Sequence, residues 1–71
     1  MSHETIGSRL KGLRMEAGFT QAEVAKELGV TPVMVLQIER GTKQLSLLNA
    51  DKLAKLYGCT KDDMLGKEDK V

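Results

Sequence analysis

The sequence predicts an all-α fold, a compact bundle of five short helices. Apolar residues recur at helical spacing, residues that favour helix starts and ends alternate along the chain, and no stretch has the alternation of a β-strand. A chain of 71 residues has room for one core, and with Phe19 and Tyr57 as its only aromatic residues that core must be aliphatic. We expect one domain over residues 1–66 and a short charged tail over residues 67–71.

The first predicted helix runs from about residue 4 to residue 17. Its apolar stripe, at spacings of three and four residues, consists of Ile6, Leu10, Leu13 and Ala17. Gly18 follows and can end the helix. Arg14 lies at the edge of the stripe, where a charged side chain needs a partner.

The second predicted helix begins after Thr20. The hydroxyl of Thr20 can accept a hydrogen bond from the first turn, and Glu23, three residues later, completes a capping box. Phe19, just before the cap, is placed to pack against Val24 as a hydrophobic staple. Gly29 can adopt the positive φ that ends many helices, so we expect this helix to end just before it.

The third predicted helix follows after a short link. Thr31 caps it, Pro32 takes its first position, where a missing N–H costs nothing, and the helix runs towards Gly41. The residues expected to join the second and third helices in a common core are Val24, Ala25, Leu28, Val35 and Ile38. The link around Gly29 forces a sharp angle, which favours a helix-turn-helix, the motif that lays its second helix in a DNA major groove. The alternative is an ordinary pair of packed helices.

Two further helices complete the predicted bundle. Ser46 can cap the fourth helix, and Gly58 can end it. Thr60 and Asp63 form another capping box, which opens a last short turn that reaches residue 66. The expected apolar face of the fourth helix consists of Leu47, Ala50, Leu53, Ala54 and Tyr57.

The charge of the chain indicates little about its partners. The formal net charge is +1, but residues 1–60 hold eight Lys and Arg against six Asp and Glu, whereas residues 61–71 hold three against four. An acidic tail thus masks a mildly basic body, although an ordinary mixed-charge surface gives the same numbers. No apolar run is long enough to span a membrane and the N-terminus has no signal pattern, so we expect no membrane association.

The sequence offers little for metal binding or catalysis. Cys59 cannot form a disulfide within the chain and has no predicted activating neighbour, so we expect a half-buried apolar residue before the last helix. His3 is the only histidine and lies in a polar N-terminal tail, so no cluster has metal-ligand spacing. The paired acids Asp62 and Asp63 belong to a cap that faces solvent. We expect no enzyme activity, no cofactor and no metal.

Four segments carry a family resemblance: IGSRLKGLR from residue 6, FTQAEVAKELGV from residue 19, IERG from residue 38 and SLLNADKLAKLYGCTKDDML from residue 46. Over residues 6–66 the chain resembles the phage repressor and Cro class of helix-turn-helix domains, the XRE-type, lambda-repressor-like regulators. The resemblance implies that the third helix is the recognition helix and that a homodimer binds a near-palindromic operator in double-stranded DNA. It also implies an ion pair between Arg14 and Glu39, which would account for the charge of Arg14 at the edge of an apolar stripe.

The resemblance also implies a set of DNA contacts. Gln21, at the N-terminus of the second helix, would contact a phosphate or a base. Gln37 can make a bidentate pair with adenine in the major groove. The outward positions of the third helix that would face DNA are Thr31, Pro32, Val33, Leu36 and Gln37. The residues just past this helix that would hold the phosphate backbone are Arg40, Thr42 and Lys43.

The third helix departs from the family pattern, which usually has polar or charged residues on the outward face. Here that face carries Pro32, Val33, Met34 and Leu36, which leaves Gln37 as the only polar side chain in its middle. The apolar residues can pack against thymine methyl groups. Alternatively, they form an exposed patch that binds protein, either a second copy of the chain or another partner.

A second departure lies at Leu45 and Leu48, where the family commonly has a proline and a polar residue. Leu48 should project outwards from the fourth helix. Apolar residues at these positions suit a dimer contact, which would add core area to a small chain. The alternative is that single exposed leucines have no function.

Three hypotheses follow from these patterns. The first is a homodimeric, sequence-specific DNA-binding transcriptional regulator, most readily a repressor, in the bacterial cytoplasm on the nucleoid. The second is a protein-interaction module, an antitoxin or adaptor whose partner covers the apolar face of the third helix. The third, an enzyme, lacks a candidate catalytic base. Selective binding to a duplex would separate the first hypothesis from the second, because fold alone does not decide function.

Overall fold

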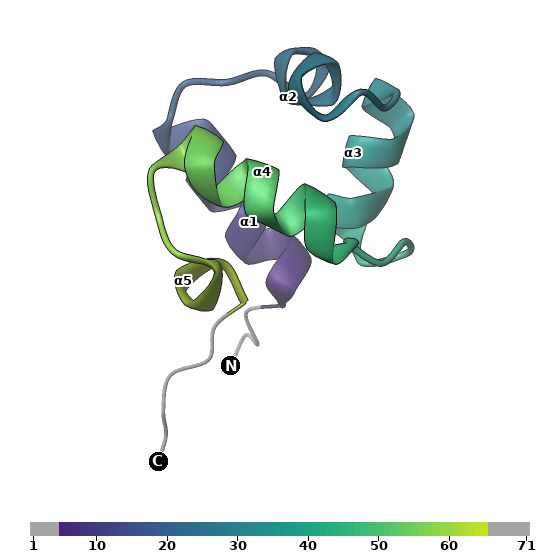
Figure 1. Cartoon of the computed structure of the whole chain (residues 1–71). Helices are drawn as coiled ribbons and strands as arrows, with labels where there is room; N and C mark the ends of the chain where they lie inside the picture. Colours follow the sequence, from purple (N-terminus) through teal and green to yellow (C-terminus); the bar gives the residue numbers. More distant parts are fainter. Residues whose placement is uncertain (1–4, 66–71) are drawn as a thin grey trace.

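The computed structural model describes residues 5–65, which form five helices with no strand among them, so the predicted all-α bundle is confirmed. The helices are α1 (Ile6–Glu16), α2 (Gln21–Leu28), α3 (Pro32–Arg40), α4 (Leu47–Tyr57) and α5 (Lys61–Leu65). In Figure 1, α2 lies at the end of the molecule opposite α5. His3 and the predicted charged tail lie outside the described residues.

The helix starts follow the capping residues. The predicted box between Thr20 and Glu23 is present: the N–H of Thr20 donates to Glu23 Oε1 at 2.8 Å, and the N–H of Glu23 donates to Thr20 Oγ1 at 3.1 Å. Thr31 and Ser46 cap α3 and α4 as expected. The first helix begins later than predicted, because the Thr5 hydroxyl accepts from the Ser8 N–H and makes Thr5 the cap.

The turn between α2 and α3 depends on a glycine. Gly29 has φ 73°, a left-handed conformation that strains residues with a Cβ, and its N–H donates to the carbonyl oxygens at the end of α2. Two residues later Thr31 already caps the next helix. This short connection produces the sharp angle between α2 and α3 that Figure 1 shows.

The core is aliphatic and draws on all five helices. Helix α2 packs against α3 and α4, α1 packs against α3 and α5, and α4 packs against α5. The predicted core residues of α2 and α3 are buried. Met64 of α5 is also fully buried, although the sequence placed it only in a terminal turn. The buried apolar side chains are Leu10, Val24, Ala25, Leu28, Val35, Ile38, Ala50, Leu53, Ala54 and Met64.

Three residues predicted to lie in apolar stripes are instead exposed. Ile6 and Ala17 lie at the two ends of α1, beyond the part that other helices cover. Leu47 lies on the first turn of α4, one turn before the buried Ala50, and 77% of its surface is exposed. Helical spacing places a residue on a face of its helix but does not show how far the neighbouring helices extend along that face.

Gly7 sets the distance between α1 and the end of α3. A Cβ at this position would collide with the backbone carbonyl oxygens of Ile38 and Glu39. The absence of a side chain therefore lets α1 approach the end of α3 closely. In the described part of the chain, no helix has the length and apolarity needed to cross a membrane.

Candidate nucleic-acid interface

Helix α3 divides cleanly into a buried side and an exposed side. Val35, Ile38 and Glu39 face the interior. The opposite side exposes the predicted contact residues Thr31, Pro32, Val33, Gln37 and Arg40. A polar amide is thus presented to solvent between an apolar N-terminal turn and a cationic C-terminal end. This is an arrangement suited to base edges and phosphates.

The apolar part of this exposed side is narrower than the sequence predicted. Met34, expected to point outwards, is half-buried and packs against the core, because its position turns it towards the other helices. Leu36 is also half-buried. Val33 keeps 61% of its surface exposed. Val33 is therefore the main apolar contribution of α3 to the surface, with Pro32 beside it.

The segment just past α3 carries the cations. Arg40 and Lys43 are exposed, with Gly41 in a left-handed conformation between them. Thr42 is engaged locally: its N–H and its hydroxyl both donate to the carbonyl oxygen of Gln37, at 2.9 and 3.2 Å. A hydroxyl has one hydrogen, so Thr42 cannot donate it to a phosphate while it closes the helix. Arg40 and Lys43 are the donors available at this point.

A shallow pocket of about 580 Å³ lies between the start of α1 and the end of α3. Arg40 and Lys43 contribute to its lining, together with apolar side chains from both segments. Leu45, predicted as a dimer contact, also lines this pocket and is half-buried against the core. Its position therefore differs from that of Leu48, which is 66% exposed on the first turn of α4.

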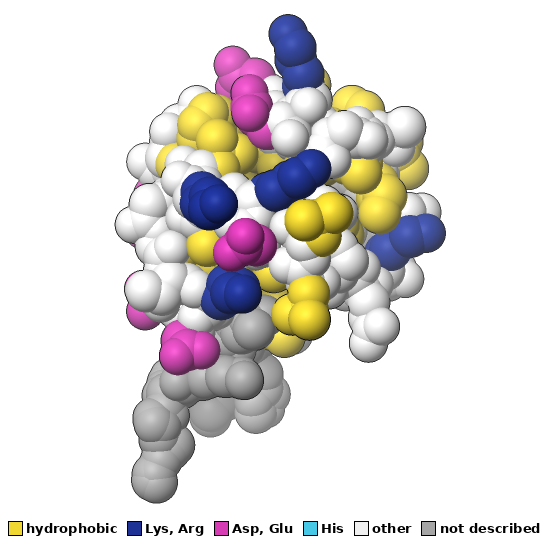
Figure 2. Space-filling model, viewed as in Figure 1, with side chains coloured by type: hydrophobic (Ala, Val, Ile, Leu, Met, Phe, Trp, Pro, Cys, Tyr) yellow, Lys and Arg dark blue, Asp and Glu magenta, His cyan; other side chains and the backbone are white. Residues whose placement is uncertain are grey.

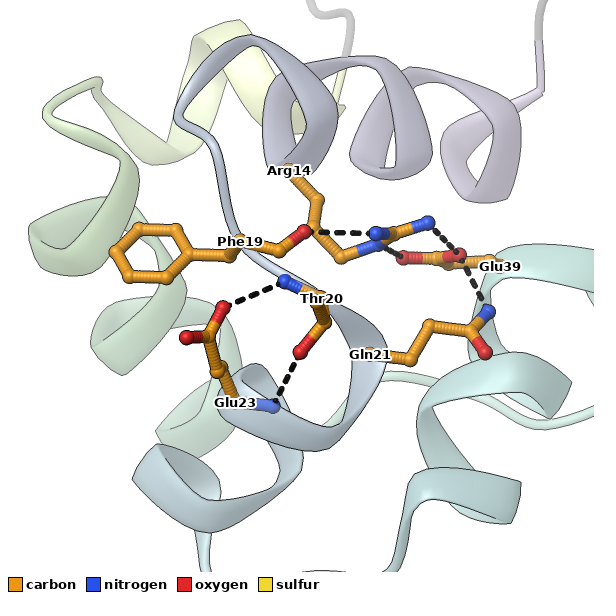
Figure 3. Close-up of polar contacts among 6 residues, drawn as sticks. All are labelled: Arg14, Phe19, Thr20, Gln21, Glu23 and Glu39. Carbon is orange, nitrogen blue, oxygen red and sulfur yellow. Dashed lines mark hydrogen bonds and ion pairs between the residues drawn. The ribbon is translucent and has the colours of Figure 1, made fainter.

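A buried ion pair holds α3 on its interior side, between the two residues that the family resemblance implied. Arg14 Nε donates to Glu39 Oε2 at 2.7 Å, and Arg14 Nη2 donates to Glu39 Oε1 at 3.3 Å. Arg14 Nη1 also donates to the carbonyl oxygen of Phe19 at 2.8 Å, in the link before α2 (Figure 3). Both charged residues are buried, at 9% exposure. The pair thus ties α1 to the end of α3 and to the start of α2.

Gln21, the first residue of α2, joins this ion pair. Its Nε2 donates to Glu39 Oε1 at 3.1 Å, and the side chain is half-buried (Figure 3). The sequence predicted a DNA contact for Gln21 but gave no sign of this bond, because the two residues are 18 positions apart and belong to different helices. The Gln21 amide thus bonds to the buried ion pair and is also partly exposed at the surface.

Tyr57 is a neighbour of this network that the sequence placed only on an apolar face. Its ring lies 6.3 Å from the ring of Phe19, between centroids. Burial raises the pKa of Tyr57 to about 12, and the nearby carboxylate of Glu39 adds to the increase. Gly7 was missed as well. A glycine inside a helical pattern is the signal that could have indicated its close approach to α3.

The face over α4 combines apolar and charged side chains. Leu47 and Leu48 are both exposed at its start. Asp51 makes ion pairs with Lys55 at 3.9 Å and with Lys61 at 3.8 Å, all of them at the surface. Figure 2 shows hydrophobic side chains standing out beside lysine, arginine and acidic side chains on this face. The charged groups on this face form ion pairs with one another, whereas the exposed side of α3 carries an amide and a cation.

The part of the chain that the structure describes gives no sign of a metal site or a reactive cysteine. No three His, Cys, Asp or Glu side chains among these residues gather closely enough to hold a metal ion. Cys59 is half-buried against the core, as predicted, and burial raises the pKa of its thiol. A thiol with a raised pKa is a weaker nucleophile at neutral pH because less of it is ionised.

Comparison with known proteins shows the family of the chain. Residues 10–64 match the family model described as helix-turn-helix. The chain is 41% identical over 53 residues to the cryptic phage CTXphi transcriptional repressor RstR of Vibrio cholerae, covering 75% of this chain and 48% of RstR. It is 34% identical over 58 residues to the transcriptional regulator RamB of Mycobacterium tuberculosis, covering 82% of this chain and 12% of RamB. The chain thus spans half or less of the length of these two relatives.

The fold matches that of a solved repressor. The P22 c2 repressor, crystallised in complex with a synthetic operator, superposes with a TM-score of 0.83 at 27% sequence identity. The match covers 93% of this chain and all of that protein chain. The α1–α5 bundle of this chain therefore has the same fold as that repressor.

Proposed function

Since the chain belongs to the XRE-type helix-turn-helix family of transcription regulators and repressors, we propose that it binds a near-palindromic operator in double-stranded DNA as a homodimer and represses transcription. The observation that carries this proposal is the exposed side of α3, with Gln37 in its middle and Arg40 at its end. In this proposal α3 enters the major groove. The protein would act in the cytoplasm, on the nucleoid.

In this proposal Gln37 reads a base. A glutamine amide can donate to N7 and accept from N6 of adenine at the same time, which no other base edge in the major groove permits. Val33 and Pro32 lie one turn earlier on the same side and would pack against a thymine methyl group. Discrimination would thus come mainly from one amide and secondarily from shape complementarity.

Phosphate contacts would come from Arg40 and Lys43 beyond α3, and from Gln21 at the start of α2. Each phosphate that a lysine or arginine neutralises releases counterions and makes affinity depend on salt. We expect Lys43→Ala to weaken binding to all sequences alike and to lower the slope of log affinity against log salt by about 0.9. Lys26→Ala, at an exposed position in the last turn of α2, is the matched control. An unchanged slope for the Lys43 variant would remove this residue from the interface.

A dimer contact is proposed at the start of α4. Leu48 and the neighbouring Leu47 are exposed there, and a self-complementary patch is what a twofold interface requires. Leu45, half-buried against the core, would contribute at the edge of such a contact. The ion-paired Asp51 and Lys55 lie one and two turns further along α4 and would form a polar rim.

A second candidate function rests on the exposure of Val33. An exposed apolar residue at the start of α3 also suits a protein partner, as in an antitoxin or adaptor. The two functions differ in what should cover α3. Under the second, a protein side chain and not a base edge would contact Val33 and Leu36.

The experiment that tests the proposal is selection of the purified protein on a random duplex DNA library, followed by titrations of the enriched site at several salt concentrations. We expect an inverted repeat with half-sites about one helical turn apart, roughly 34–36 Å, and an affinity that falls steeply with salt. Weak binding without enrichment would contradict the proposal and favour the protein-interaction function.

A further inference from the structure

We propose that Glu39 is a positioning residue for DNA binding, which fixes the orientation of the Gln21 carboxamide so that one N–H and the carbonyl oxygen of Gln21 meet DNA in set directions. The inference rests on the proposed DNA contact of Gln21. It assigns the buried ion pair a part in recognition beyond holding α3 in place. Its evidence is the hydrogen-bond network around Glu39 (Figure 3).

The orientation follows from the chemistry of the two groups. A carboxylate bonded to a guanidinium can only accept hydrogen bonds, whereas the two ends of a carboxamide differ, one donating and the other accepting. Gln21 Nε2 donates to Glu39 Oε1 at 3.1 Å. If the amide were rotated by half a turn, two oxygens would face each other without a hydrogen between them. The charge of Glu39 therefore selects one of the two amide orientations.

Arg14 in turn holds both carboxylate oxygens of Glu39 in place. Two N–H groups of Arg14 fix these oxygens, and the Glu39 side chain is only 4% exposed. Arg14 is in turn fixed by its bond to the carbonyl oxygen of Phe19, which immediately precedes the cap of α2. The two outer residues of this network, Phe19 and Gln21, thus both lie at the beginning of α2. Gln21 cannot change its amide orientation without losing a bond to a buried charge.

The hydrogen-bonding groups of the Gln21 side chain that Glu39 does not use are the ones that can contact DNA. One hydrogen of Nε2 goes to Glu39, and the second hydrogen and the carbonyl oxygen are left; Figure 3 shows this oxygen directed away from Glu39. The capping box uses the backbone N–H groups of Thr20 and Glu23, not those of Gln21 and Ala22. A phosphate at this helix end would therefore meet backbone N–H groups together with an amide N–H that is already oriented.

Pre-orientation matters because a mobile glutamine loses rotational freedom when it binds. A mobile glutamine can also adopt the rotated amide orientation, in which its oxygen, an acceptor, would face the phosphate in place of the N–H. Replacing the Glu39 carboxylate by an amide removes the selection, since an amide can both donate and accept. The Glu39→Gln variant keeps the shape of the side chain. It should lose affinity through Gln21 specifically.

The first test uses the free protein and is independent of DNA. The chain has three glutamines, and the other two, Gln37 and Gln44, are exposed and serve as internal controls. We expect the side-chain amide of Gln21 to give an NMR order parameter near that of rigid backbone, about 0.85, and those of the controls to lie below about 0.6. An amide of Gln21 as mobile as the controls would overturn the inference, whether or not the protein binds DNA.

The second test is a double-mutant cycle on the DNA site obtained by selection. We expect Glu39→Gln to weaken DNA binding about fivefold or more in the parent protein and less than about twofold when Gln21 is already alanine. Glu16→Gln, on the exposed side of α1, makes the same change in charge and is the matched control; it should not weaken binding. Equal losses in both backgrounds would show that Glu39 does not act through Gln21.

The outcomes separate this inference from the proposed function. If the parent protein does not bind the duplex, the proposed function fails while the NMR result still tests the fixed amide. If Gln21→Ala leaves DNA affinity unchanged, Gln21 makes no contact and the inference fails while the proposed function stands. Thermal unfolding of each variant identifies any loss that arises from unfolding. If Glu39→Gln does not fold, the order parameters of the parent protein decide.

Discussion

The carboxylate of Glu39 receives three N–H donors, two from Arg14 and one from Gln21. Taking a charge out of water is costly, and these donors compensate for that cost. Removing one partner of such a buried pair leaves the other without compensation, which typically destabilises a protein by about 3–5 kcal/mol. At the scale of the residue, the presentation of α3 therefore depends on a polar network and not on apolar packing alone.

Tyr57 offers a direct measurement beside this network. Burial raises its pKa from 10.0 to about 12, with Glu39 adding to the increase. Below pH 10 the ring is neutral in both folded and unfolded chains; between pH 10 and about 12 the unfolded chain loses the proton more readily, so stability falls as pH rises. Since the ring is partly exposed, the loss should amount to about 1 kcal/mol.

The tyrosinate absorbance gives this titration directly, because Tyr57 is the only tyrosine and the chain has no tryptophan. We expect a midpoint well above 10 in the folded protein and one near 10 in urea. A folded-state midpoint at the ordinary tyrosine value would contradict the position of the ring. Tyr57→Phe should remove the corresponding part of the pH dependence of stability.

At the scale of the element, α1 and α3 meet where Gly7 faces the backbone of Ile38 and Glu39. We expect Gly7→Ala to destabilise the protein by about 1–3 kcal/mol, because the added methyl group forces the two helices apart. Gly12→Ala is the matched control on the same helix, where a Cβ would meet nothing within 4 Å. That change should stabilise α1 by about 0.5–1 kcal/mol. Thermal unfolding of both variants measures the difference; equal effects would argue against the close approach.

Elements whose boundaries depend on local chemistry were predicted well from the sequence. The capping box of α2 and the glycine turn after it involve residues that are neighbours in the chain. The residues that the prediction misplaced depend on contacts between distant segments: Met34 turns towards the core, Leu47 extends beyond it, and Met64 fills its far end. The bond from Gln21 to Glu39 is of the same kind. Periodicity within one helix contains no information about such contacts.

At the scale of the whole molecule, the small aliphatic core leaves Leu47 and Leu48 exposed at the start of α4. If these form the dimer contact, Leu48→Lys should shift the sedimentation coefficient towards that of a monomer, since it places two charges in one apolar interface. Met15→Lys is the matched control, because Met15 is also exposed but lies on α1. No shift with Leu48→Lys would place the interface elsewhere.

A dimer formed through α4 would couple the proposed contact to the spacing of the two α3 helices. Two copies joined through α4 would hold their α3 helices at a fixed separation, and this separation sets the spacing of the half-sites. The loss of the dimer should therefore reduce affinity for an inverted repeat far more than affinity for a single half-site.

The claim that α3 reads base edges is tested most directly by parallel selections on a random duplex library with the parent protein and with Gln37→Ala. We expect the variant to lose its preference at one position of each half-site, at a cost of about 1–3 kcal/mol on the parent site, while the remaining positions are unchanged. Gln44→Ala, an exposed glutamine beyond α3, is the matched control. An identical site enriched by the Gln37 variant would show that this amide reads no base, and would contradict the recognition role given to α3.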